Sequence, residues 1–393
     1  MSQLRFRNFG NLSFLQSVDK PQFLSRLLAE HSAYFERHGI DVGALTNGDA
    51  CARRLLEVFT QPDDAMPGTL LQAIHLLDAL ADEAGHERIL EEARRCSVDL
   101  GAMPDDLCPG DFALAVWLEH PWLVRVCREK TVCQSFKRYY EFRSPDGRRL
   151  DLSTVKAKIG ELQEILGPWF DSRQRTPTCE VFVYEEGTEI RCLVTHGALY
   201  RTDGTITAKL QRERIGYRPQ RHDSIIYDTD SGILKIHAQF ATERMAYREA
   251  FGRVLFEDPA YFPEGPTYTL ECLRTNGGSL AVVAGMRSVR LTEVWIESHT
   301  DKCRQQILKG VDLTEMVAGR GPIDLAGGEI VRAGFSIGYS SGGRARRLEV
   351  CLPNVADHDR DRDGTVVEAF LRANHFIATE PDGDGSGRLV AAA

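Results

Sequence analysis

Residues 329–339, EIVRAGFSIGY, alternate between apolar side chains and small or charged ones. Val331 and Phe335 fall on one side of an extended chain, whereas Arg332 and Ser336 fall on the other. Because successive side chains of a strand point to opposite faces, this stretch predicts a strand with one buried and one solvated face.

Residues 344–352 follow the same pattern, with Leu348 and Val350 on one side. The two segments predict a long antiparallel hairpin, because Gly342 and Gly343 between them can adopt the positive φ angles of a tight turn. Further strands are predicted at residues 179–184, 189–196, 224–228, 233–239, 267–274, 279–283 and 289–296, and helices at 242–256 and 365–374. This half is therefore expected to be α+β, with antiparallel hairpins.

Before residue 170 the apolar residues recur at helical spacing instead. Helices are predicted at residues 21–37, 51–59, 69–82, 86–96, 111–119, 122–143 and 153–166. Pro21 suits the first turn of the first helix, and Gly39 is suited to ending it. A short polar stretch at residues 171–177 separates the two patterns and predicts a domain boundary.

The predicted fold class is α+β. An all-α N-terminal bundle or helical-hairpin array spans residues 1–172, and an antiparallel β-rich α+β domain spans residues 173–379. Residues 380–393 mix acidic residues with glycine and are expected to form a flexible C-terminal tail.

Composition narrows the class of protein. No apolar run approaches the roughly 18 residues of a membrane span, and the first ten residues lack the apolar core of a signal peptide, so we expect a cytoplasmic protein without membrane contact. The ten cysteines form no regular framework and are expected to be reduced. A net charge of −9 argues against indiscriminate coating of nucleic acid, although a basic patch can exist within an acidic total.

An acidic segment is a weak candidate for calcium binding. Asp359, Asp361 and Asp363 alternate before Gly364, as the first ligands of an EF-hand loop do. The twelfth position, which should carry a bidentate glutamate, is Phe370. We therefore favour the alternative that Asp363 caps a helix beginning near residue 365, and we predict no metal or cofactor.

A second candidate lies on the first predicted strands, where acidic and imidazole groups recur. His196, Asp228 and His237 are the residues that a metal-dependent hydrolase or nuclease would use here. A restriction-type E-x-K pattern fails at Lys235, because Ile233 stands two positions before it.

The third candidate is basic. Arg212, Arg214, Arg218 and Arg221 are interleaved with Tyr217 in a segment that we expect to be an extended loop. Guanidinium groups bind phosphates, and an aromatic ring can stack on a base. Glu213 and Asp223 are the only nearby acidic residues, so part of this charge is expected to be available to a partner.

The sequence contains none of the common catalytic motifs, such as GxSxG, GxxxxGKS, GxGxxG before a helix, or HExxH. We therefore expect a cytosolic binding or assembly protein, more an accessory subunit than an enzyme. It would engage a protein partner or a nucleic acid through the helical half and the arginine loop, for example in a bacterial multi-gene system such as phage defence. The alternative function is the metal-dependent hydrolase or nuclease on the first strands.

Overall fold

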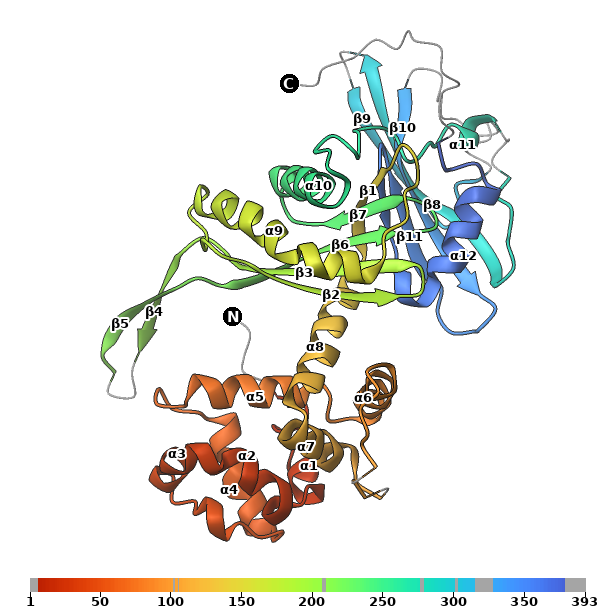
Figure 1. The fold of residues 1–393 in the computed structure, drawn as a ribbon. Coiled ribbons are helices and arrows are strands. Elements are labelled where there is room, and N and C mark those ends of the chain that lie inside the picture. The colour runs from red at the N-terminus through yellow and green to blue at the C-terminus, as the bar shows by residue number, and fades with distance from the viewer. Residues whose placement is uncertain are drawn as a thin grey trace. The chain divides into compact units, whose positions relative to one another are not determined.

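The structure, a computed structural model, describes residues 6–101, 103–104, 106–206, 210–275, 279–300, 303–314 and 328–378. Its contacts divide the chain into two compact units, Met1–Val132 with Arg201–Tyr217, and Cys133–Tyr200 with Arg218–Ala393. The fold is α+β, as the sequence predicted (Figure 1). The predicted tail at residues 380–393 lies outside the described residues.

The first unit is mainly helical and has a single apolar core. Its helices are α1 (Leu12–Ser17), α2 (Ser25–Leu28), α3 (Ser32–Arg37), α4 (Asp49–Thr60), α5 (Gly68–Asp78), α6 (Glu83–Arg95), α7 (Pro109–Glu119) and most of α8 (Pro121–Ser135). The core includes Leu28, Phe35, Phe59 and Ile74, all without exposed surface. Each of these side chains comes from a different helix, so their shared burial holds the helices together.

The helix predicted at residues 21–37 is interrupted. A π-helical turn at Lys20–Leu24 precedes α2, and a 3₁₀ turn at Ala29–His31 separates α2 from α3. His31 leaves the helical region, with φ −118° and ψ 16°. Apolar spacing indicates which face is buried, but it does not distinguish hydrogen bonds to the third, fourth or fifth residue, so these breaks were not predicted.

The helix predicted at residues 122–143 is too long. It ends at Ser135, and β1 (Arg138–Arg143) follows as a strand. Tyr140 pairs with Ile236 on one side and with Val355 on the other. Pairing on both sides overrides the helical spacing, because strand formation depends more on neighbouring strands than on local preference.

The second unit begins earlier than the predicted boundary at residues 171–177. It contains β1 and also α9 (Leu152–Asp171), whose Val155, Leu162 and Phe170 are buried in a core shared with the strands. The sequence reveals that α9 is amphipathic but not which surface it covers. The division between Val132 and Cys133 therefore differs from the predicted one.

A ten-stranded antiparallel sheet is the centre of the second unit. In spatial order it contains β2 (Glu180–Glu186), β3 (Glu189–Gly197), β6 (Gln220–Asp228), β7 (Ile233–His237), β1, β12 (Val355–Asp357), β11 (Arg346–Cys351), β10 (Gly328–Tyr339), β8 (Met286–Thr300) and β9 (Cys303–Lys309). The predicted hairpin is β10 and β11, in which Phe335 pairs with Leu348.

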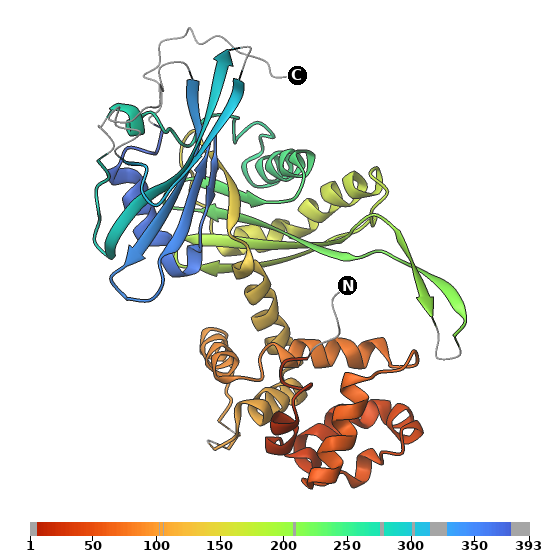
Figure 2. The same cartoon turned by 180° about the vertical axis from the view of Figure 1, so that it is seen from behind.

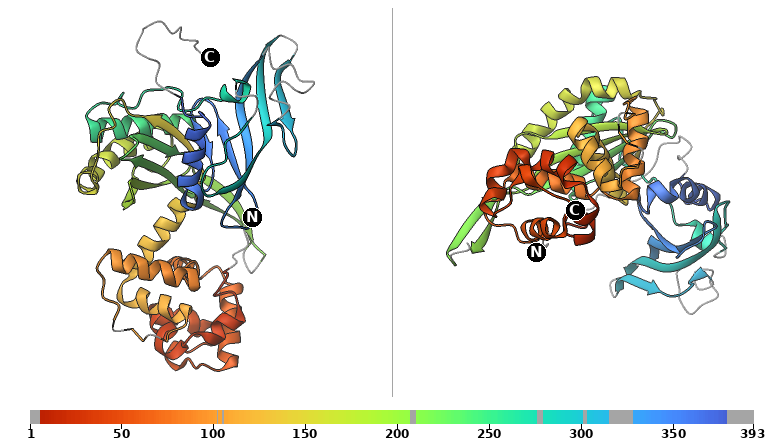
Figure 3. Two further views of the ribbon diagram at one scale, coloured as in Figure 1. Left: turned by 90° about the vertical axis from the view of Figure 1, so that its right-hand side faces the viewer. Right: turned by 90° about the horizontal axis from the view of Figure 1, so that it is seen from below.

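The two halves of this sheet are covered on opposite faces. Phe142 of β1 belongs to the core beneath α9 and α10 (Ala241–Phe256). Ala356, which pairs with Tyr139 on the other face of β1, belongs to the core beneath α12 (Arg360–Ala373). The sheet is strongly twisted, and α12 lies between its two halves (Figures 2 and 3). The face of the first half that lies opposite α9 and α10 is therefore turned toward the N-terminal end of α12.

Three predicted helices and strands of this half differ from the structure. Residues 267–274 form no strand beyond an isolated bridge at Tyr268, and they include the helical turn α11 (Cys272–Thr275). Residues 279–283 have no regular structure. The final helix α12 begins at Arg360, five residues before the predicted start, so Asp363 lies inside its first turn instead of capping it. Asp359 occupies the cap position without a side-chain hydrogen bond.

The arginine segment is a two-stranded sheet and not an extended loop. β4 (Arg201–Ile206) and β5 (Arg212–Tyr217) pair antiparallel between β3 and β6 in the sequence. In the part of the chain that the structure describes, no helix has the length and apolar character to span a membrane.

Candidate functional site

The paired strands β4 and β5, here called the arginine ribbon (residues 201–206 and 212–217), have two faces of different chemistry. Arg212 pairs with Ile206, and Arg214 pairs with Gly204. Cross-strand partners share a face, so both arginines and Gly204 lie on the same side. This basic face also carries Thr202 and its partner Gly216.

The opposite face of the ribbon is mixed and slightly acidic. It carries Arg201, Asp203, Thr205, Glu213, Ile215 and Tyr217. The Tyr217 hydroxyl donates to Asp203 Oδ2 at 2.7 Å, and this hydrogen bond raises the pKa of the tyrosine. The aromatic ring that the sequence placed beside the arginines is therefore on the other face and already has a partner.

Both arginines of the basic face are exposed and available. Among the described residues, neither Arg212 nor Arg214 has a hydrogen-bond or ion-pair partner. The other two predicted binding arginines differ from them. Arg218 donates through NH1 to the backbone oxygen of Gln174 at 2.5 Å, and Arg221 donates to the side-chain oxygen of Gln239.

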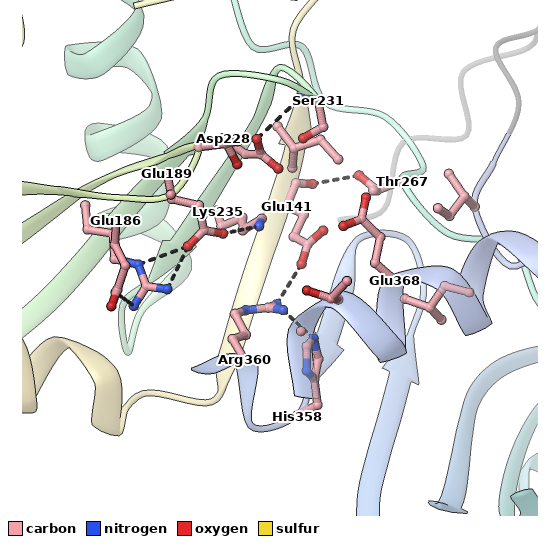
Figure 4. A pocket seen from close by; sticks show the side chains of 18 of the residues that line it. Glu141, Glu186, Glu189, Asp228, Ser231, Lys235, Thr267, His358, Arg360 and Glu368 are labelled. Carbon is pink, nitrogen blue, oxygen red and sulfur yellow. Dashed lines mark hydrogen bonds and ion pairs between the residues drawn. The ribbon is translucent and has the colours of Figure 1, made fainter. Parts of the chain in front are cut away.

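A second candidate is a cavity of about 280 Å³ in the second unit, between α12 and the face of the sheet that lies opposite α9 and α10 (Figure 4). Its acidic, basic and imidazole lining residues are Glu141, Glu186, Glu189, Arg191, Asp228, Lys235, His358, Arg360 and Glu368. Strand register explains why they gather: Glu189 pairs with Asp228, and Lys235 pairs with Glu141, on one face of adjacent strands.

Most charges of the cavity neutralise one another. Lys235 Nζ lies 2.6 Å from Glu189 Oε1, and Arg191 lies 2.8 Å from Glu189 Oε2. Burial raises the pKa of Glu189, but Lys235 and Arg191 lower it by more, so the net pKa is below its usual value. This carboxylate therefore stays ionised well into the acidic range.

The N-terminal end of α12 completes this network. Arg360 donates to Glu141 Oε1 at 2.6 Å, and Tyr268 donates to Glu141 Oε2 at the same distance. Arg360 also donates to His358 Nε2 at 2.5 Å, which makes that nitrogen an acceptor. Burial, together with the charges of Arg360 and Lys235, lowers the pKa of His358 far below 6.5. His358 is therefore neutral.

Asp228 is an exception in the cavity. It is 9% exposed, and its Oδ1 accepts the backbone N–H groups of Asp230 at 3.0 Å and Ser231 at 3.4 Å. No basic side chain pairs with it among the residues that the structure describes. Figure 4 shows it close to Ser231 and Glu189 at the cavity wall.

The predicted hydrolase residues are not brought together. Only Asp228 lines the cavity. His237 stacks on Phe136 and has its Nδ1 at 2.7 Å from the Arg138 carbonyl. His196 is buried elsewhere and stacks on Phe170.

His196 belongs to a buried group with Asp223 and Glu243, whose potential ligand atoms lie within 4.8 Å of one another. His196 Nε2 is 3.0 Å from Asp223 Oδ2, which also accepts the Tyr247 hydroxyl at 2.7 Å. Glu243 pairs with Arg175 at 2.5 Å and accepts the Phe240 N–H at 2.7 Å. Both carboxylates are thus engaged by protein groups, and the guanidinium of Arg175 beside Glu243 would repel a cation.

The acidic segment does not converge on a single ion position either. Asp359 lies 3.7 Å from Lys137, and Asp361 lies 2.8 Å from Arg191. Asp363 accepts two hydrogen bonds from Arg346. A calcium ion would have to displace three cationic side chains that come from three separate parts of the chain.

Sequence reasoning found Asp228 as a candidate on the first strands but missed Glu141, His358 and Arg360. Glu141 fell inside a predicted helix. His358 and Arg360 adjoin the acidic segment, where only the carboxylates drew attention. No protein-family model matches this chain, and no curated protein matches it in sequence. The functional argument therefore depends on the geometry of the chain itself.

Proposed function

We propose that this protein is a nucleic-acid-binding accessory protein that contacts its partner through the basic face of the arginine ribbon. The observation that supports the proposal is the pair Arg212 and Arg214, which are exposed, unpaired among the described residues, and side by side on one face. Exposed guanidinium groups that have no internal partner contribute little to folding and remain available to phosphates.

The separation of the two arginines suits a phosphate backbone. Alternate residues of a strand are about 6.8 Å apart along its axis. Each strand of duplex DNA carries one phosphate per about 3.4 Å of helix axis, so two steps cover about the same length. The acidic total of the chain, −9, does not prevent such binding, because the basic face concentrates positive charge locally.

The test compares Arg212→Ala/Arg214→Ala with the unchanged chain by fluorescence anisotropy on a labelled 20-base-pair DNA at several salt concentrations. Each phosphate contact contributes about −0.9 to the slope of log affinity against log salt, so the double variant should flatten the slope by about 1.8. Arg201→Ala is the matched control, because it removes an arginine from the other face of the same ribbon. It should leave the slope unchanged.

An acidic protein surface is the alternative partner of the same face. The double variant would then lose association rate for that protein and bind DNA as the unchanged chain does. Equal binding of DNA by the double variant and the unchanged chain at all salt concentrations would reject the nucleic-acid proposal.

A second candidate function is metal-dependent hydrolysis in the cavity, favoured by Asp228, whose Oδ2 has no partner among the residues that the structure describes. One or two carboxylates are enough to hold Mg²⁺ when a substrate phosphate supplies further ligands. Titration calorimetry with Mn²⁺ and a nuclease assay, each with Asp228→Asn as control, test this candidate. Absence of both metal binding and cleavage in the unchanged protein would exclude it.

A further inference from the structure

Two of the positions on the basic face of the ribbon are glycines, which have no side chain. Gly204 lies directly across from Arg214, and Gly216 lies across from Thr202. Nothing in the fold requires glycine at position 204, because its φ is not positive and a Cβ there would meet no atom within 4 Å. Glycine within a strand weakens it, and one common reason for its presence is the close approach of a ligand or another backbone.

This face of the two strands also carries one large apolar side chain, which is exposed. Ile206 pairs with Arg212 and is 66% exposed. The face therefore presents two guanidinium groups, one apolar side chain, the hydroxyl of Thr202 and two positions without side chains. Arginine contacts guanine edges and backbone phosphates, and apolar side chains contact the methyl group of thymine in the major groove.

The arrangement of the ribbon disfavours a single strand. Binding of single strands combines a basic groove with aromatic rings on which bases stack. On this ribbon, the aromatic ring of Tyr217 is on the face opposite the arginine pair, beside the carboxylates of Asp203 and Glu213. A strand stacked on Tyr217 would meet one arginine, its cross-strand partner Arg201, against two carboxylates on the same face, and it would reach neither Arg212 nor Arg214.

We propose that the basic face of the ribbon binds B-form duplex DNA by entering its major groove. Two strands lie about 4.8 Å apart, and the major groove, about 12 Å wide, admits a two-stranded ribbon. The major groove of A-form RNA is too deep and narrow for this, so duplex RNA is not a matching partner. This inference depends on the proposed function and specifies its partner.

The experiment measures binding of the full chain to three labelled 20-mers of one sequence: the DNA duplex, the DNA single strand and the RNA duplex. We expect the DNA duplex to bind at least tenfold more tightly than either of the others. Gly204→Val should weaken duplex binding by about tenfold, because it places a branched side chain between the arginines and the groove. Thr205→Val is the matched control, since it introduces valine on the opposite face.

Each result is decisive. Equal affinity for the single strand and the duplex, with sensitivity to Arg212→Ala/Arg214→Ala, would overturn the duplex inference and leave the proposed function standing. Unchanged duplex binding by Gly204→Val would also overturn it. Failure to bind any of the three nucleic acids would reject the proposed function itself. Circular dichroism checks folding of the valine variants, and Gly204→Ala, with a smaller side chain, should fall between valine and the unchanged chain.

Discussion

The cavity beside α12 and the basic face of the ribbon contain the same kinds of residue in opposite circumstances. In the cavity, Arg360 is buried and hydrogen-bonded to Glu141, and Arg191 is buried among three carboxylates. On the ribbon, Arg212 and Arg214 are exposed and have no partner among the described residues. Burial and pairing decide whether an arginine serves the fold or remains free for another molecule.

The difference has an energetic origin. Removing a guanidinium group from water is costly unless a carboxylate and hydrogen bonds compensate for the lost hydration. The cavity provides this compensation through strand register, which sets Glu141 beside Lys235 and Glu189 beside Asp228. The ribbon provides none, but its arginines keep their hydration and lose it only when a partner binds.

The largest expected effect is a loss of folding stability when the charge network of the cavity is broken. Arg360→Ala should lower the free energy of unfolding by about 3–5 kcal/mol, because Glu141 would remain buried without its cation. Urea denaturation measures this loss. Arg372→Ala, on the same helix, is the control: its pair with Glu368 is exposed, so about 0.5 kcal/mol or less should be lost. Similar losses in both variants would show that the cavity network is not a structural element.

The titration of His358 should change the free energy of unfolding by an intermediate amount. Its pKa is lowered far below 6.5 in the folded protein by burial and by Arg360 and Lys235, whereas the unfolded chain takes up the proton near 6.5. The unfolded state therefore binds more protons, and the free energy of unfolding should fall as the pH drops below 6.5, by up to about 1.4 kcal/mol per pH unit.

His358→Gln can still accept a hydrogen bond from Arg360 and does not titrate. Urea denaturation of this variant should show a shallower loss of stability between pH 6.5 and pH 5 than the unchanged protein shows. Glu189 does not interfere in this range, because its lowered pKa removes stability only below its ordinary value of 4.5. Identical pH profiles would mean that the folded protein protonates His358 normally.

The parts of the fold that the sequence predicted are those specified by local patterns. The alternation in residues 329–339 is determined by the strand itself, and it predicted β10 correctly. β1 was missed because Tyr139, Tyr140 and Phe142 follow a helical stretch without a break, and only pairing with β7 and β12 makes them a strand. The cover that α9 gives to the sheet is likewise a long-range property.

The candidate sites show the same limit. The clustering of arginines identified the segment but not its two faces. The sequence did contain the information needed to separate the faces, because Arg212 and Arg214 occupy even positions and Tyr217 an odd one. Treating the segment as a strand would have separated them. The cavity was beyond prediction, because Glu141 and Arg360 are 219 positions apart and meet only through the sheet.

The smallest expected change in the free energy of unfolding is that of the ribbon arginines. Arg212→Ala/Arg214→Ala should change the free energy of unfolding by less than about 0.5 kcal/mol, because exposed side chains without partners contribute little to the folded state. Urea denaturation beside Arg360→Ala gives the direct contrast between one buried arginine and two exposed ones. A loss of several kcal/mol in the double variant would show that the ribbon arginines are internal braces like Arg360. Their charge would then not be available to any partner, and the assignment of the basic face as an interface would fail.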